Sequence, residues 1–531
     1  MPDQDGGGIP RSVRRSRREA PLALLALLIG GLALFAPGLR SGYFGDDLMF
    51  VHDSHAHGIV PYFTDGRALS VWYRPIEAMI LAAVQSRVGW DTFPVHVVAL
   101  AAHVLECWIV WLAVRRLGGS ARASVLAAIA MLVSQANAMA VLSTDTLSQL
   151  LSTLFGSACL LLLSPRAADL RSPAVAPLRS WIAALGAWAC FTLALFSKES
   201  SVALLPLVAV VAWLSPGPPA FSGRVGRVVR LMLPLVLTFA VFMLLRRMAN
   251  GPAPAFGEQR YNLRLGPNVL ANLALVLGSA CLAGSSVSVY GALAAHGIRG
   301  LLASPTDPAT LTVVAIAAGT VLVLGLLGVG LVRSKQRALL LTLLACSVLA
   351  VAPMLLLNHV GELYTYAAMP FIAVVFGWVI AEWWERLPAP PARAALAIGL
   401  AALLVSHVLA VRQKLELLRV NGGRAAVLLA EVGPFVAQVA PGGTLLLVEP
   451  RGTAGGYSIY RTSGFHPIEY GRYWLREHYH RPDIYVRVIA ESELTANPGW
   501  LVGAVALTLR DGHVVPMAPQ GSPESPESPT R

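Results

Sequence analysis

The amino-acid sequence predicts a polytopic α-helical membrane protein with about eleven membrane spans. Of its 531 residues, 56% are hydrophobic and only 13% are charged, whereas a soluble domain carries about 25% charged residues. The hydrophobic residues gather in runs of about 20, the length that an α-helix needs to cross a bilayer. Lys and Arg gather in the short loops between these runs, the pattern that sets the orientation of membrane proteins.

Eleven apolar runs are long enough to be spans, and a twelfth is ambiguous. With the basic N-terminus in the cytoplasm, the arginine clusters of alternate loops all fall on the cytoplasmic side. The cluster at Arg333–Arg337 does so only if the chain is outside both at residue 247, before the twelfth run (267–290), and at residue 309, after it. We therefore expect a re-entrant or surface-lying helix there, the alternative being a pair of short crossings. The eleven expected spans lie near residues 20–38, 93–114, 122–141, 145–164, 180–197, 199–215, 229–246, 310–332, 337–357, 365–384 and 394–411.

The sequence changes character after residue 411, where we expect a small α/β domain. A helical stretch precedes strand-like runs separated by Gly and Pro, and the chain ends in a Ser-Pro-Glu repeat typical of disorder. The topology above places this domain outside the membrane. The expected elements are a helix from Arg412 to Val439 and strands at Thr444–Val448, Ile484–Ile489 and Val502–Leu509. The expected parts of the chain are a basic cytoplasmic N-terminus (1–19), a transmembrane domain (20–411), the extracytoplasmic α/β domain (412–515) and a disordered tail (516–531).

The composition excludes two other classes of protein. The net charge is +12, but no basic stripe interleaved with aromatic residues is present, so we expect no nucleic-acid partner. All five cysteines lie inside apolar runs. A disulfide framework or a cysteine-based zinc site is therefore not expected.

The first outer loop, residues 40–90, opens with two adjacent carboxylates, Asp46 and Asp47. Beside a span exit they would lie among lipid head groups, and an aspartate can take the proton of an attacking hydroxyl. His52, His55 and His57 follow. They are weak candidates for a divalent metal, because nothing in the sequence fixes their geometry. The alternative for Asp46 and Asp47 is an ordinary polar cap on a span, and for the three histidines it is an inert exposed loop.

Basic residues on the outer side are candidates for binding a lipid phosphate. Arg74 precedes an apolar stretch, residues 76–88, that we expect to lie in the membrane interface, and its forked guanidinium suits a phosphate. Arg260 and Arg264 form an outer basic patch, which also suits an anionic head group. The alternative for Arg74 is simple anchoring of the protein to the interface, and for Arg260 and Arg264 it is contact with anionic lipid.

Three later turns on the outer side carry further candidates. They hold Asp145, then Lys198 and Glu199 in a tight turn between two spans, then Glu362 and Tyr364. Ionisable residues at the membrane boundary are costly and tend to be functional. A structural ion pair between Lys198 and Glu199 is the alternative.

Taken together, these residues resemble the C-superfamily (GT-C) glycosyltransferases. More narrowly, they look like bacterial relatives of the O-mannosyltransferases that carry tetratricopeptide repeats and of the protein O-mannosyltransferases. Asp46–Asp47 resembles the family's acidic motif, whose first carboxylate is taken as the catalytic base. Tyr73–Pro75 resembles its Arg-Pro segment. Gln135–Leu150, with Asp145, is similar to a stretch ending in Asp followed by Leu, and Phe196–Ser200 to a Ser-Lys-Glu turn.

One motif departs from this pattern. The family's late Glu-Arg-Tyr-Leu-Tyr motif appears as Glu362-Leu-Tyr-Thr-Tyr366, with Leu363 in place of the arginine. If that arginine helps to hold the donor phosphate, Arg260 or Arg264 must replace it. The C-terminal region is also not a repeat array.

The resemblance implies an inverting, hexosyl- or mannosyltransferase-like enzyme. It would move a sugar from a polyprenyl-phosphate donor to a hydroxyl of a protein or of an envelope glycan or lipid, at the outer face of the bacterial inner membrane. No cofactor is expected, a divalent metal being possible but not favoured. The implied roles are base for Asp46, with Asp47 beside it; phosphate binding for Arg74, Lys198, Arg260 and Arg264; and substrate orientation for Asp145, Glu199, Glu362 and Tyr364.

Two other functions stay open at this point. An envelope-polymer ligase or polymerase would use a large outer loop with Arg and His, and would not need Asp46. A transporter or flippase favours inverted repeats and broken helices at the membrane midplane, for which the sequence gives no sign.

Overall fold

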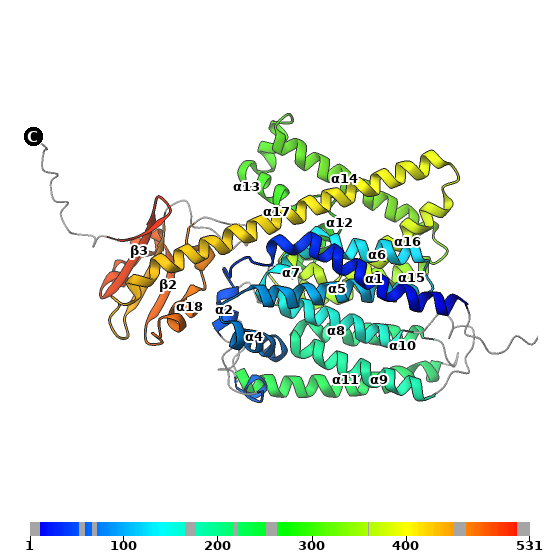
Figure 1. Ribbon diagram of the computed structural model, residues 1–531, viewed down its shortest axis with the longest axis horizontal. Helices are drawn as coiled ribbons and strands as arrows, with labels where there is room; N and C mark the ends of the chain where they lie inside the picture. Colours follow the sequence, from blue (N-terminus) through cyan, green and yellow to red (C-terminus); the bar gives the residue numbers. More distant parts are fainter. Residues whose placement is uncertain are drawn as a thin grey trace, which may run out of the picture. The chain divides into compact units, whose positions relative to one another are not determined.

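The computed structural model describes residues 11–52, 59–65, 72–164, 177–215, 221–250, 263–358, 360–450 and 464–517, most of them helical (Figure 1). The chain divides into two compact units. The first comprises Met1–Leu39, Ala56–Gly89 and Phe93–Glu416, and the second comprises Arg40–His55, Trp90–Thr92 and Leu417–Arg531.

The first unit is a bundle of apolar helices. Long apolar runs become helices in a bilayer because only a helix satisfies its own backbone hydrogen bonds. Helix α6 packs against α5 and α16, and α8 against α5 and α9, which places α5, α6 and α8 near the middle of the bundle. The helices are α1 (Arg11–Phe35), α3 (Pro61–Thr64), α4 (Pro75–Val88), α5 (Phe93–Arg116), α6 (Ala121–Val133), α7 (Ala138–Leu142), α8 (Leu147–Leu163), α9 (Pro177–Ser197), α10 (Leu204–Leu214), α11 (Phe221–Asn250), α12 (Pro267–Cys281), α13 (Ser286–Ala303), α14 (Pro308–Arg333), α15 (Arg337–Leu355) and α16 (Met369–Arg386).

Short 3-10 helices interrupt this bundle, and all but η1 occur at polar motifs of the sequence. They are η1 (Ala36–Gly38), η3 (Gln135–Asn137), η4 (Thr144–Thr146), η5 (Glu199–Ala203) and η7 (Glu362–Ala367). Such short, tight turns often mark strained or functional positions between α-helices.

The polytopic helical class predicted from the sequence is confirmed. Seven helices within the described residues are long and apolar enough to cross a membrane, and the bent pair formed by α6 and η3–α7, at 47°, makes an eighth candidate. The eleven expected spans all coincide with helices. Those at α9, α10 and α16 are shorter or more charged than the rest.

The ambiguous run 267–290 is not one element but parts of two helices. Helix α12 ends at Cys281, and α13 begins at Ser286. The break has a local cause, because Ser285 caps α13: its Oγ accepts a hydrogen bond from the Ser288 backbone N at 3.4 Å. The run expected to hold a re-entrant or surface-lying helix is therefore divided between two helices at residues 282–285.

Helix α17 (Pro390–Val436) also differs from expectation. We expected a span to end near residue 411 and a separate helix to begin at Arg412, but α17 is continuous for 47 residues. Val411 to Leu418 are helix-compatible residues without Gly or Pro, so nothing in this stretch stops the helix. Helix α17 therefore begins in the first unit and ends in the second.

The second unit contains a small four-stranded sheet of order β2-β1-β3-β4, with β1 parallel to both neighbours and β4 antiparallel to β3. The central strand is a continuous apolar run, as expected of a buried parallel strand. The hydrophobic core of this unit includes Leu446, Val448, Ile489 and Ala506. The elements are β1 (Thr444–Glu449), α18 (Gly471–His478), β2 (Tyr485–Ala490), α19 (Glu491–Ala496), β3 (Ala504–Arg510) and β4 (His513–Pro516).

Candidate functional site

A buried group of charged side chains lies in the first unit, which we call the Arg74 cluster (Arg74, Glu77, Asp145, Ser148, Lys198, Glu199 and Tyr364). Arg74 is at its centre. Its Nε lies 3.4 Å from Glu199 Oε2, its Nη1 donates to Ser148 Oγ at 3.2 Å, and Nη1 lies 3.7 Å from Glu77 Oε2. Segments more than a hundred residues apart in the chain thus meet at one guanidinium.

Local sequence explains how α4 presents two of these groups. Pro75 occupies the first helical position, where its fixed φ suits a helix and its missing N–H costs nothing. Arg74 is the residue before the helix, and Glu77 lies in its first turn. Glu77 Oε1 in turn accepts a hydrogen bond from the backbone N of Ser148, at 2.8 Å, in the first turn of α8, where a carboxylate is favoured by the helix dipole.

Lys198 is the second buried cation. It is only 3% exposed and has an extended backbone at the junction of α9 and η5. Its Nζ lies 5.1 Å from the centre of the Tyr364 ring, within the range of a cation–π contact. The charges of Arg74, Glu77, Asp145 and Glu199 all act on it.

Aromatic residues hold the segments that carry the two cations. Tyr73 precedes Arg74, and Phe196 lies two residues before Lys198. Their rings pack with Phe242 of α11, at centroid distances of 5.3 Å for each pair with Phe242. Edge-on packing of this kind fixes both ring positions and backbone direction. The aromatic group thus sets the positions of Arg74 and Lys198.

Burial shifts the titration of two members. It raises the pKa of Glu77 to about 7, since the charged carboxylate loses solvation. Burial, with the charge of Arg74 as a second cause, lowers the pKa of Lys198 to about 8. Both groups therefore titrate near neutral pH, where a small change in their surroundings changes the charge of the cluster.

Asp145 completes the Arg74 cluster from η4. Its Oδ1 accepts a hydrogen bond from Ser143 Oγ at 2.5 Å, and the charges of Lys198 and Arg74 act on it. The structure thus brings together Arg74, Asp145, Lys198, Glu199 and Tyr364, five of the residues predicted from separate turns of the sequence.

A groove begins beside the Arg74 cluster. Its cavity volume is about 40 Å³, and Gln149, Thr153, Gly156, Ser201 and Leu204 are among the residues that line it. Gln149 follows Ser148 of the cluster in the chain. Helices α8 and α10 border the groove, and its lining combines hydroxyl and amide side chains with apolar ones such as Leu204 and Leu207.

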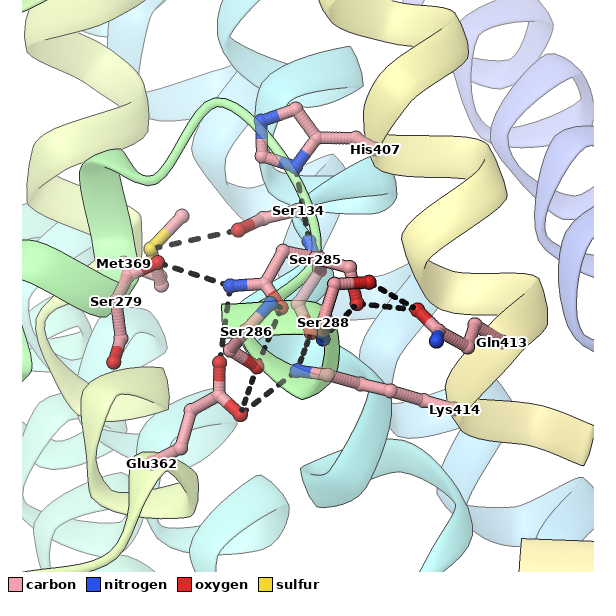
Figure 2. Close-up of polar contacts among 11 residues, drawn as sticks. Ser134, Ser279, Ser285, Ser286, Ser288, Glu362, Met369, His407, Gln413 and Lys414 are labelled. Carbon is pink, nitrogen blue, oxygen red and sulfur yellow. Dashed lines mark hydrogen bonds and ion pairs between the residues drawn. The ribbon is translucent and has the colours of Figure 1, made fainter. Parts of the chain in front are cut away.

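Glu362 belongs to a separate group in the first unit (Figure 2). Its Oε2 pairs with Lys414 Nζ at 2.7 Å and accepts from Ser286 Oγ at 3.1 Å, while Oε1 accepts from Gln135 Nε2 at 3.0 Å. Lys414 also donates to the Gln135 backbone oxygen at 2.8 Å. We call Gln135, Ser286, Glu362 and Lys414 the Glu362 network.

Asp46 and Asp47 lie in the second unit. The turn before them is made by Gly45, whose φ of 55° is in the left-handed region that favours glycine. Gly45 N donates to Pro467 O at 2.8 Å. Asp47 begins the short helix α2 (Asp47–His52), which packs against α18. Asp47 is buried, and Asp46 is partly exposed.

The remaining predicted residues fall elsewhere. Arg264 is exposed, and its backbone N donates to Leu356 O at 2.6 Å. Arg260, His55 and His57 lie outside the described residues, as does the side chain of His52. Over the part of the chain that the structure describes, no group of three or more His, Cys, Asp or Glu residues could hold a metal ion.

Sequence reasoning missed Glu77, Gln135 and Lys414 as site residues. Glu77 had a signal, because it is a lone carboxylate in an apolar stretch and lies three residues after Arg74. Lys414 had none, since it looks like one of several charged residues on an exposed helix, yet it is fully buried.

Comparison with known proteins identifies the fold. No family model and no curated protein sequence matches the chain. The crystal structure of ArnT from Cupriavidus metallidurans in the apo state matches with a TM-score of 0.52 and 12% identity, over 94% of this chain and 98% of that one. The crystal structure of the same protein bound to undecaprenyl phosphate matches with a TM-score of 0.50 and 13% identity, over 93% of this chain and 96% of that one. The chain is a membrane protein with the GT-C glycosyltransferase fold, which confirms the fold predicted from the resemblance.

Proposed function

We propose that this chain is a glycosyltransferase that moves a hexose from a polyprenyl-phosphate donor to a hydroxyl acceptor at the outer face of the bacterial inner membrane. The observation that carries the proposal is the Arg74 cluster. Two cations from distant segments are buried side by side and held by aromatic packing, next to a groove that leads among membrane helices.

Two buried cations favour the binding of an anionic ligand. Arg74 offers a planar set of donors that matches a phosphate, and Lys198 supplies a second charge. In the absence of a ligand, Glu77, Asp145 and Glu199 balance them. A donor phosphate would compete with Glu199 for Arg74, and the low-polarity surroundings would strengthen that contact.

In this proposal the prenyl chain of the donor begins at the groove between α8 and α10 and continues along the outer surfaces of these helices, with its phosphate beside Lys198. The lining of the groove combines polar and apolar side chains. One of the solved structures with this fold holds undecaprenyl phosphate, which supports this class of lipid.

Asp46 is the proposed base, on the ground that Asp46–Asp47 resembles the acidic motif of the GT-C glycosyltransferases; Asp46 belongs to the second unit and the Arg74 cluster to the first. Asp46 would take the proton of the acceptor hydroxyl as that oxygen attacks the anomeric carbon. The bond from this carbon to the phosphate oxygen breaks on the opposite face, so the configuration inverts and polyprenyl phosphate leaves. Arg74 and Lys198 stabilise the charge that develops on the leaving phosphate. Asp47, Asp145, Glu199, Glu362 and Tyr364 remain proposed as orienting or supporting residues, and the acceptor is a hydroxyl of a protein or of an envelope glycan or lipid.

Binding of undecaprenyl phosphate to the purified protein tests the phosphate site. We expect Arg74→Gln and Lys198→Met each to raise the dissociation constant at least about tenfold, since each removes a charged hydrogen-bond partner worth about 1.5–3 kcal/mol. Arg337→Gln is the matched control, because Arg337 is an exposed arginine at the start of α15. If all three variants bind the lipid like the unaltered protein, the Arg74 cluster is not the phosphate site.

A further inference from the structure

The 3-10 helix η7 carries polar side chains at alternate positions. Glu362 enters the Glu362 network, the Tyr364 ring lies against Lys198, and the Tyr366 hydroxyl lies 2.9 Å from His103 Nδ1 on α5. A 3-10 helix has three residues per turn, so positions two apart point in three different directions. One short element therefore contacts three separate polar partners.

The Glu362 end of η7 is held from several directions (Figure 2). Lys414 reaches it from α17, Gln135 from η3 and Ser286 from the start of α13. Lys414 is wholly buried, and its partner is nearly so. A buried ion pair adds little net stability compared with apolar residues, so its use here suggests that it fixes a geometry.

We propose that the Lys414–Glu362 pair is a positioning device for the donor phosphate: it fixes η7 so that Tyr364 stays against Lys198. This inference rests on the proposed function, because it takes Lys198 as a phosphate ligand. Lys414 and Glu362 do not touch the donor. They act through Tyr364, whose ring holds the Lys198 ammonium in place.

The neighbouring residue Gln413 provides a matched control. It also bonds from α17 to α13, since its Oε1 accepts from Ser285 Oγ at 2.5 Å and from Ser288 Oγ at 3.3 Å. These partners lie on α13 and before it, not on η7. Gln413→Leu therefore removes polar contacts of the same helix while leaving the Lys414–Glu362 pair in place.

The test measures undecaprenyl phosphate binding and thermal stability in a double-mutant cycle. Lys414→Met alone leaves a buried carboxylate without its partner and can impair folding, so the main variant is the double substitution Glu362→Gln with Lys414→Met, which removes both charges. We expect it to weaken binding roughly three- to tenfold, the effect of losing a partly desolvated cation–π contact. Tyr364→Leu should weaken binding by a similar factor.

The decisive result is the binding constant of the variant that combines all three substitutions. Adding Tyr364→Leu to the double substitution should change binding by less than about twofold more, because both act on the same contact. Independent, multiplying effects would overturn the inference, as would a double variant that binds normally or a Gln413→Leu variant that binds as weakly. The proposed function is judged separately, by Lys198→Met. If Lys198→Met binds undecaprenyl phosphate normally, the phosphate site itself is misplaced. If only the double substitution Glu362→Gln with Lys414→Met binds normally, the positioning role alone is refuted.

Discussion

The surroundings of Lys198 disfavour the protonated, charged form of its side chain. It is buried at the junction of α9 and η5, and the guanidinium of Arg74 acts on it as a like charge. Both effects disfavour the protonated form. The side chain therefore gains most when an anion arrives, which is the property expected of a group that receives a phosphate.

Donor binding should depend on pH through this residue. Because the pKa of Lys198 is lowered to about 8, its charge is present at pH 7 and lost as the pH rises through 8. We expect the dissociation constant for undecaprenyl phosphate to rise on the order of tenfold between pH 7 and pH 9, the effect of losing one charge-assisted contact. Isothermal titration over this range stays above the second phosphate pKa of about 6, so the ligand charge is constant.

Two variants separate the contributing groups. In Lys198→Met the rise above pH 8 should disappear. In Glu77→Gln it should be smaller but still present, since Glu77, with a pKa raised to about 7 by burial, also gains negative charge over this range and so adds to the loss of affinity. Binding that is constant or becomes tighter from pH 7 to pH 9 would rule out protonated Lys198 as a phosphate ligand.

At the scale of elements, close backbone contact explains how the segment before Asp46 is placed in the second unit. Gly42 lies directly against Gly422 of α17, where an added Cβ would meet the Gly42 backbone N at 2.5 Å. Gly422 is followed by Gly423, where an added Cβ would meet nothing within 4 Å. Two adjacent glycines in one helix therefore have different roles.

This contrast predicts opposite effects of the same substitution. Gly422→Ala forces the two backbones apart and should destabilise the protein by about 1–3 kcal/mol, the usual cost of overpacking. Gly423→Ala should be neutral or stabilising, because alanine favours a helix by up to about 1 kcal/mol over glycine. Thermal unfolding of both variants in detergent checks this. Equal transition temperatures would mean that residues 40–45 do not pack against α17 as described.

Local patterns in the sequence were sufficient for most elements and for part of the site. Apolar runs located the helices, and Pro75 and the Ser-Lys-Glu turn located Arg74 and Lys198. The same patterns failed where position depends on distant partners. Nothing near Lys414 in the sequence shows that it is buried against Glu362. The break that we expected at residue 411 followed the end of the apolar run, although residues 411–418 contain no Gly or Pro that would stop the helix.

At the scale of the whole molecule, the proposed chemistry needs no bound metal. The charge on the leaving phosphate can be neutralised by a divalent ion or by fixed cations, and here Arg74 and Lys198 are already in place. His52, His55 and His57 are the residues on which a metal site would depend, and the structure does not describe their side chains. We propose that transfer does not depend on a divalent ion.

Sugar transfer by the purified protein from a polyprenyl-monophosphate hexose, in excess EDTA, addresses the function as a whole. We predict product from this donor and none from a nucleotide sugar. Asp46→Asn should lose roughly 10²–10⁴-fold in turnover, the usual worth of a positioned acid–base group, while still binding undecaprenyl phosphate. Transfer that requires added Mn²⁺ or Mg²⁺, transfer that is unaffected by Asp46→Asn, or movement of the lipid-linked sugar across vesicles without a new glycosidic bond would contradict the proposed enzyme.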